Sequence, residues 1–168
     1  MREMRLHKRE LHDPEAIKEI LEECDVVRIG ARDAEGMFII PVNYGYDFSM
    51  SGEAMKLVLF IHGAGEGRKA DAFAAFPDVA VEMDCRHGII TGDYTCSYSY
   101  SYRSIMGNGT VSRVDDRQEK IYGLTKIMEH MAPGAKLEFS PEMLERTEVF
   151  RIEVEHFTAK ERKQKQSS

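Results

Sequence analysis

The strongest constraint on the fold is a series of six β-rich runs joined by turns and short helical segments. The runs cover residues 26–32, 37–46, 56–62, 79–87, 98–114 and 149–157. They lack the regular alternation with long helices that is typical of a doubly wound parallel sheet. The pattern therefore predicts a mainly β (α+β) protein, a small antiparallel barrel with short peripheral helices. Closing the sheet also removes the exposed edges of such apolar strands.

Two helices are indicated by their start signals. Asp13 and Pro14 precede apolar residues at helical spacing, which predicts a helix over about 14–24. Asp115 with Gln118 resembles a capping box that opens a later amphipathic helix. Both helices are short enough to lie on the outside of a barrel.

Length and composition indicate one globular domain. The chain has 168 residues, of which 42% are hydrophobic and 31% charged. Residues 1–160 are expected to form a single domain, and the polar residues 161–168 a disordered tail. Its 29 acidic and 23 basic residues give a net charge of −6, which argues against binding to nucleic acid or an anionic membrane.

The cysteines favour a reduced, cytoplasmic setting. Cys24, Cys85 and Cys96 are odd in number and form no CxxC pair. No segment has the pattern of a signal peptide or of a membrane-spanning helix. Cys85 and His87 share a strand face, but their spacing matches no structural zinc motif, so no metal site is predicted.

A glycine-rich loop after the run 56–62 is the most informative motif. Residues 63–67 read GAGEG, and Arg68 and Lys69 follow at the start of an expected helix over 68–76. Glycines let backbone N–H groups approach an anion, the helix start is electropositive, and the two side chains add full charges. The spacing fits neither a Walker A loop nor a dinucleotide fingerprint. It predicts a phosphomonoester site, and a solvated turn before a helix is the alternative.

Two further segments could contact a planar ligand. Pro41 interrupts a strand, and Asn43 offers a donor and an acceptor that suit the imide edge of a flavin or pyrimidine. A bulged edge strand explains the same residues. Tyr98, Tyr100 and Tyr102 share one strand face, which could stack on a ligand, pack across a dimer interface, or simply stabilise the strand.

His62 is the one histidine placed beside a candidate site, because it ends an apolar strand against the glycine loop. A histidine there can transfer protons or can simply be a satisfied strand-end residue. No GxSxG motif is present, so a hydrolytic triad is not supported.

The order of motifs resembles the nitroimidazole-resistance related flavoproteins of the pyridoxamine 5'-phosphate oxidase-like split-barrel superfamily. The similarity covers about residues 5–160. It rests on DPEAIKEILEECDVVRIGARDAEGMFIIPVNYGYDF, LVLFIHGAGEGRKADAFAAFPDVAVEMD and YRSIMGNGTV. The resemblance implies a six-stranded split β-barrel that forms a homodimer and binds FMN in two equivalent clefts between the subunits.

The resemblance also implies a set of cofactor-binding residues. The strand expected along the isoalloxazine ring contributes Pro41, Val42, Asn43 and Tyr44. The residues expected around the ribityl phosphate are His62, Gly63, Ala64, Arg68 and Lys69. The YRS element of the cleft corresponds to Tyr102, Arg103 and Ser104. Thr158-Ala159-Lys160 departs at its middle residue from the TGK sequence that often closes the last strand in the family.

The function implied is an FMN-dependent oxidoreductase that reduces a small electron-poor aromatic such as a nitroimidazole. A nicotinamide cofactor is the candidate electron donor. His62 is the candidate proton donor, and Tyr102 a candidate wall of the pocket. Two alternatives stay open: a non-catalytic protein that stores or senses flavin or another phosphorylated ligand, and amine oxidation of the pyridoxamine phosphate oxidase type.

Overall fold

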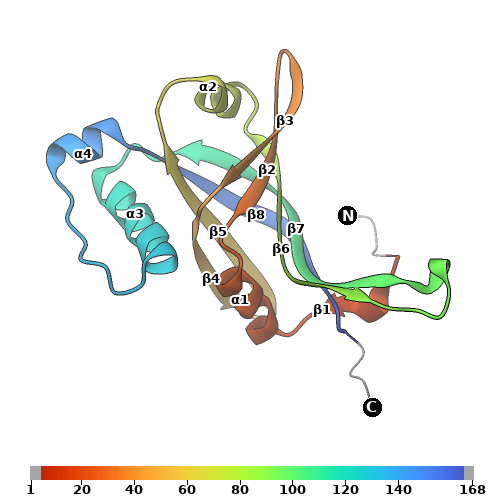
Figure 1. The fold of residues 1–168 in the computed structure, drawn as a ribbon. Coiled ribbons are helices and arrows are strands. Elements are labelled where there is room, and N and C mark those ends of the chain that lie inside the picture. Colours follow the sequence, from red (N-terminus) through yellow and green to blue (C-terminus); the bar gives the residue numbers. More distant parts are fainter. Residues whose placement is uncertain (1–4, 165–168) are drawn as a thin grey trace.

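The computed structural model describes residues 5–164. Within them the chain forms eight strands, four α-helices and two short 3-10 turns (Figure 1). The strands are β1 (Glu10–Leu11), β2 (Val27–Asp33), β3 (Gly36–Val42), β4 (Gly45–Ser51), β5 (Ala54–Gly63), β6 (Asp78–Ile90), β7 (Ser99–Arg113) and β8 (Glu148–Arg162). The helices are α1 (Pro14–Glu23), α2 (Arg68–Ala75), α3 (Arg117–Met131) and α4 (Pro141–Arg146).

The strands form one antiparallel sheet in the order β3-β2-β6-β7-β8-β5-β4, with β1 paired to β8. The expected class, mainly β with short peripheral helices, is confirmed. The expected count of six strands is corrected to eight. The run 37–46 divides at Asn43 and Tyr44 into β3 and β4, and β1 adds a two-residue strand. The predicted hairpin over the first two runs is confirmed, because β2 and β3 pair from Val27↔Val42 to Asp33↔Gly36.

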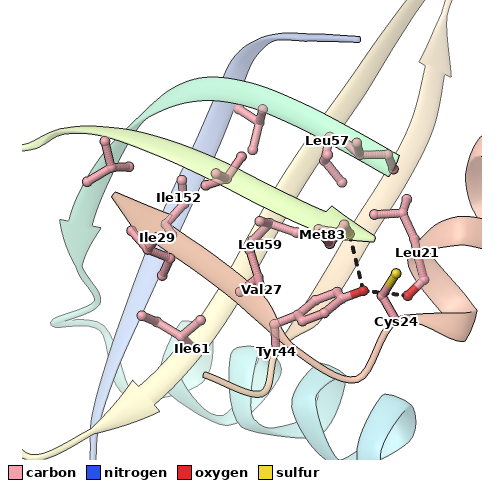
Figure 2. Close-up of a cluster of buried hydrophobic side chains, with 14 of the residues drawn as sticks. Leu21, Cys24, Val27, Ile29, Tyr44, Leu57, Leu59, Ile61, Met83 and Ile152 are labelled. Carbon is pink, nitrogen blue, oxygen red and sulfur yellow. Dashed lines mark hydrogen bonds between the residues drawn. The ribbon is translucent and has the colours of Figure 1, made fainter. Parts of the chain in front are cut away.

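One face of the curved sheet encloses the core. Fully buried side chains from β2, β5, β6, β7 and β8 meet α1 in a single cluster. Tyr44 lies within this cluster, and its hydroxyl donates a hydrogen bond of 2.7 Å to the Leu21 carbonyl (Figure 2). The same hydroxyl oxygen lies 3.3 Å from the Met83 sulfur. These contacts attach the end of α1 to the barrel and occupy the only polar group of the Tyr44 side chain.

Three of the four α-helices within residues 5–164 begin at a residue whose side chain caps them, and α2, which follows Gly67, has no such cap. Asp13 accepts from the Glu15 N–H at the start of α1, as predicted. For α3 the predicted cap is displaced by one residue, because Asp116 rather than Asp115 accepts from the Glu119 N–H. Helix α4, capped by Ser140, was not predicted.

Helix α3 lies on the outer face of the barrel. A second buried cluster joins its residues Leu124 and Ile127 to Phe60 of β5 and Val149 of β8. This packing covers the outside of β5 and the first part of β8 and leaves the outer faces of β6 and β7 open (Figure 1).

The last strand is longer than expected. Strand β8 continues to Arg162, and Glu161 is nearly buried in an ion pair with Arg103, so residues 161 and 162 belong to the sheet and not to a tail. Residues 165–168 of the expected tail lie outside the described residues.

Candidate functional site

The ammonium group of Lys69 lies beside the glycine loop and has no carboxylate partner among the described residues. A Cβ atom on Gly63 would collide with Nζ of Lys69, so the Lys69 side chain fills the space that the glycine leaves open. Burial lowers the pKa of Lys69, and the one aromatic ring near its Nζ is Phe150, at 5.8 Å from the ring centre. Within residues 5–164 no Asp or Glu oxygen lies within 4.0 Å of that nitrogen. A partly buried cation without a counter-ion is suited to an anionic ligand.

Arg68 has a different role from the one predicted. Its guanidinium donates two hydrogen bonds of 2.5 and 3.1 Å to the Asp33 carboxylate and lies 4.2 Å from the centre of the Phe38 ring. The Arg68 guanidinium in turn lowers the pKa of Asp33. Arg68 therefore ties α2 to the β2–β3 hairpin, whereas Lys69 has no carboxylate within 4.0 Å among residues 5–164.

His62 lies beside this cation. The surrounding protein atoms and the positive charge of Lys69 lower the pKa of His62 below its ordinary value. Its imidazole is consequently neutral near pH 7, with one nitrogen as donor and the other as acceptor. The structure thus places His62, Gly63 and Lys69 together at the end of β5, as predicted.

A second group of predicted residues lies on the open outer face of the sheet. Pro41 of β3 is the register partner of Arg28 of β2. The Arg28 guanidinium donates a hydrogen bond of 2.9 Å to the Asp84 carboxylate. Asp84 in turn is the register partner of Ser104, and Ser104 that of Lys160. Tyr102 precedes Ser104 on the same face of β7 by the alternation of the strand.

This outer face carries a groove of about 530 Å³. Its walls are mainly apolar and come from β2, β3, β6, β7 and β8; Ile39, Met106, Asn108 and Lys160 are among the residues that line it. The groove could not be predicted from the sequence, because its walls come from strands that are far apart along the chain.

Three of the predicted cofactor-binding residues have side chains that pack inside their own chain. Tyr44 is fully buried in the core, and Val42 faces inward against it. Arg103 is buried, and its guanidinium makes hydrogen bonds of 2.6 Å to both Glu19 and Glu161. Their side chains hold the fold together and do not line an open surface of this chain.

Asn43 is exposed and donates a hydrogen bond of 2.9 Å to the Asp25 carbonyl. Its amide oxygen is thereby oriented away from that bond and remains an acceptor. Ala64 lies exposed in the glycine loop.

The glycine loop and the Tyr102–Ser104 element lie far apart in one chain. Gly63 is opposite Glu148 at one end of β8, whereas Ser104 is opposite Lys160 near the other end. Twelve residues of strand correspond to roughly 40 Å of chain contour. One protomer therefore brings together the loop residues, and separately the outer-face residues, but not both groups.

The comparisons with known proteins identify the family. The model of the family described as pyridoxamine 5'-phosphate oxidase matches residues 13–161. The chain belongs to this family, and its fold is the split barrel that the sequence resemblance implied. No curated protein matches the chain.

Solved structures show the same fold. A candidate 5-nitroimidazole antibiotic resistance protein from Bacteroides thetaiotaomicron aligns with a TM-score of 0.76 and 26% identity, over 90% of this chain and 85% of that one. A flavocytochrome from Azotobacter vinelandii aligns at 0.77 with 20% identity, over 96% and 72% of the two chains. An FAD and heme binding protein from Mycobacterium smegmatis aligns at 0.77 with 17% identity, over 95% and 77%.

Among residues 5–164, no group of three or more His, Cys, Asp and Glu side chains is arranged to hold a metal ion. No helix in that part of the chain is both long and apolar enough to cross a bilayer.

Proposed function

We propose that this protein binds FMN as a homodimer and uses it to reduce small electron-poor aromatic compounds such as nitroimidazoles. The observation that carries the cofactor assignment is the Lys69 ammonium, which fills the space above Gly63 and has no carboxylate partner within residues 5–164. A phosphate monoester beside the glycine loop would supply the missing counter-charge. Support for a flavin comes from the family match and from relatives described as flavin-binding.

The chain's own residues have separate tasks in this proposal. Lys69, the N–H groups of the glycine loop and the neutral His62 hold the phosphate. Pro41 and the amide of Asn43 border the ring. When bound, the flavin supplies the electron transfer. Tyr102 forms a wall for a planar substrate, and His62 is the candidate proton donor.

The homodimer is proposed because each chain carries two separated halves of the cofactor site. A second copy can place its Tyr102–Ser104 element beside the first copy's loop. The outer face that would meet it is unusually apolar: Met37, Ile39 and Met106 are 74%, 69% and 55% exposed. Isolated apolar side chains are common on protein surfaces, but a contiguous group beside an apolar groove is typical of an interface.

The deciding experiment is a spectrum followed by a turnover assay. Purified protein should show the visible absorption of a flavin, and mass spectrometry of the released ligand should give FMN. Loaded protein should then reduce 2-methyl-5-nitroimidazole with a nicotinamide donor over many turnovers. Protein that binds no FMN would refute the proposal.

The second candidate function is flavin storage or sensing without catalysis. The lowered pKa of His62 favours it, because a neutral imidazole is a poor proton donor at pH 7. A storage protein would oxidise no more than one equivalent of donor for each bound flavin. The same assay therefore separates the two functions, and testing an amine substrate covers the amine-oxidase alternative.

A further inference from the structure

A buried carboxylate lies directly beneath the glycine loop. Glu148 begins β8 opposite Gly63, and a Cβ atom on Gly65 would lie 2.7 Å from the Glu148 Cγ. The Glu148 side chain is 10% exposed, and its Oε2 accepts no hydrogen bond from residues 5–164. Buried polar atoms nearly always have a hydrogen-bond partner, so this oxygen is an exception.

Two cations balance that carboxylate. Arg113, at the end of β7, donates a hydrogen bond of 2.8 Å from Nη2 to the Glu148 Oε1. Lys120 of α3 lies 4.0 Å from Oε2. The Arg113 side chain is 55% exposed and its Nε is 3.7 Å from the exposed Asp115 carboxylate, so part of its five-donor guanidinium remains available.

Arg113 faces the same loop as Lys69. A pocket of about 190 Å³ lies between the loop, α2 and β7, and Gly65, Arg113 and Phe150 contribute to its walls. Phe150 is the register partner of Arg113 across the sheet, and its ring also lies under the Lys69 ammonium. Both cations therefore lie near the Phe150 ring, Lys69 over its face and Arg113 opposite it in the register of β7 and β8.

Charges of both signs surround this pocket. Asp71 of α2 also lines it and opposes an anion, as do Glu148 and Asp115. Lys69, Arg113 and Lys120 balance these three carboxylates, and a phosphate has to be held by direct contacts with the cations. Arg68, the cation that the sequence placed here, is held by Asp33.

We propose that Arg113 is the second cation of the phosphate site and that Glu148 is a positioning residue, which aims the guanidinium and supports Gly65. The ligand class is a phosphate monoester that contacts Lys69 and Arg113 together. The inference rests on the proposed function only for the assignment of that phosphate to FMN.

The test compares two flavins that differ only in the phosphate. Flavin-free protein is titrated with FMN and with riboflavin, and the quenching of flavin fluorescence gives each affinity. Arg113→Ala should weaken FMN binding at least tenfold and riboflavin binding less than twofold. Glu148→Gln and Glu148→Ala both remove the charge that opposes the phosphate, but only the glutamine keeps an oxygen that can accept from Arg113. The ratio of FMN to riboflavin affinity should therefore be lower in Glu148→Ala than in Glu148→Gln, and equal ratios would contradict the positioning role. Arg117→Ala, a neighbouring exposed arginine at the start of α3, is the matched control and should leave both affinities unchanged.

An unchanged FMN affinity in Arg113→Ala, or an equal loss for both flavins, would overturn the inference. Arg113→Lys, which keeps the charge and loses the fork of donors, should recover part of the FMN affinity and serves if the alanine variant unfolds. Wild-type protein that binds no FMN refutes the proposed function, and inorganic phosphate then replaces the flavin as the probe. Phosphate should raise the melting temperature of the wild type and not of Arg113→Ala, and equal shifts would overturn the inference.

Discussion

At the scale of single residues, Arg68 and Lys69 are neighbours with opposite roles. Arg68 is neutralised by Asp33 and stacks on Phe38, whereas Lys69 has no carboxylate within 4.0 Å among the described residues. Consecutive helical residues point in directions about a quarter turn apart, so adjacent charges can reach different parts of the fold. Sequence spacing alone could not separate them.

We therefore expect the two positions to respond differently to mutation. Lys69→Ala removes a charge-assisted contact to the phosphate worth about 1.5–3 kcal/mol, so FMN affinity should fall roughly 10- to 150-fold. Arg68→Ala should leave FMN affinity within about threefold, because its guanidinium is bound to Asp33. Fluorescence titration of both variants measures this. Equal losses in the two variants would contradict the assignment.

The role of His62 can be tested through pH. Burial and Lys69 lower the pKa of His62 in the flavin-free protein. In the loaded enzyme, a rate that needs the protonated imidazole falls as the pH rises through the pKa of His62. At saturating FMN, Lys69→Ala removes the nearby positive charge and should move the inflection to higher pH. Turnover of 2-methyl-5-nitroimidazole between pH 4.5 and 8 gives the profile. A rate independent of this inflection, or unchanged in His62→Ala, would exclude His62 as the donor.

At the scale of elements, helix α1 contacts the barrel through apolar packing and through one hydrogen bond from the buried Tyr44 hydroxyl. Tyr44 donates to the Leu21 carbonyl near the end of α1 (Figure 2). Ile17 and Ile20 of the same helix belong to the buried core cluster. Arg103 adds an ion pair from β7 to Glu19 of the same helix. The predicted site residues Tyr44 and Arg103 thus act through the position of α1.

Removing the Tyr44 hydroxyl should lower stability without affecting flavin binding. Tyr44→Phe keeps the ring and leaves the buried Leu21 carbonyl without its partner, a cost of about 1–3 kcal/mol. Urea unfolding of the flavin-free protein measures the loss, and Tyr98→Phe, at an exposed hydroxyl, is the control. An FMN affinity reduced more than tenfold in Tyr44→Phe would instead place this residue in the cofactor site.

At the scale of the whole molecule, helices cover one side of the barrel and leave another side open. Helix α3 lies over β5 and β8 and leaves the outer faces of β6 and β7 uncovered (Figure 1). The apolar groove lies on this open side, lined by the exposed Ile39 of β3 and Met106 of β7 among others. Strands β6 and β7 also extend beyond the barrel as a hairpin with exposed aromatic side chains. A two-stranded ribbon of this kind is only marginally stable alone in water, which is consistent with a partner on this face.

A charge placed on this face should separate the subunits. Sedimentation of the wild type should give one species near twice the 19.2 kDa chain mass. Met106→Asp should give a monomer and reduce FMN affinity, because burying an unpaired carboxylate in an apolar interface is costly. Met50→Asp, at a methionine of β4 that is 47% exposed, should remain dimeric. A wild-type monomer that still binds FMN tightly would show that one chain completes the site.

Local sequence determined the elements of this protein, because turn residues, helix caps and strand alternation act over a few positions. The β2–β3 hairpin, the Asp13 cap and the glycine loop beside His62 and Lys69 were all predictable on that basis. Only the tertiary structure decided which charges remain free. Arg68 meets Asp33 and Arg103 meets Glu161 across 35 and 58 positions of sequence, and Glu148 meets the loop through sheet register. Such pairings depend on the closure of the sheet, which brings distant strands to within a few ångströms. Sequence spacing does not show which residues the closed sheet brings together.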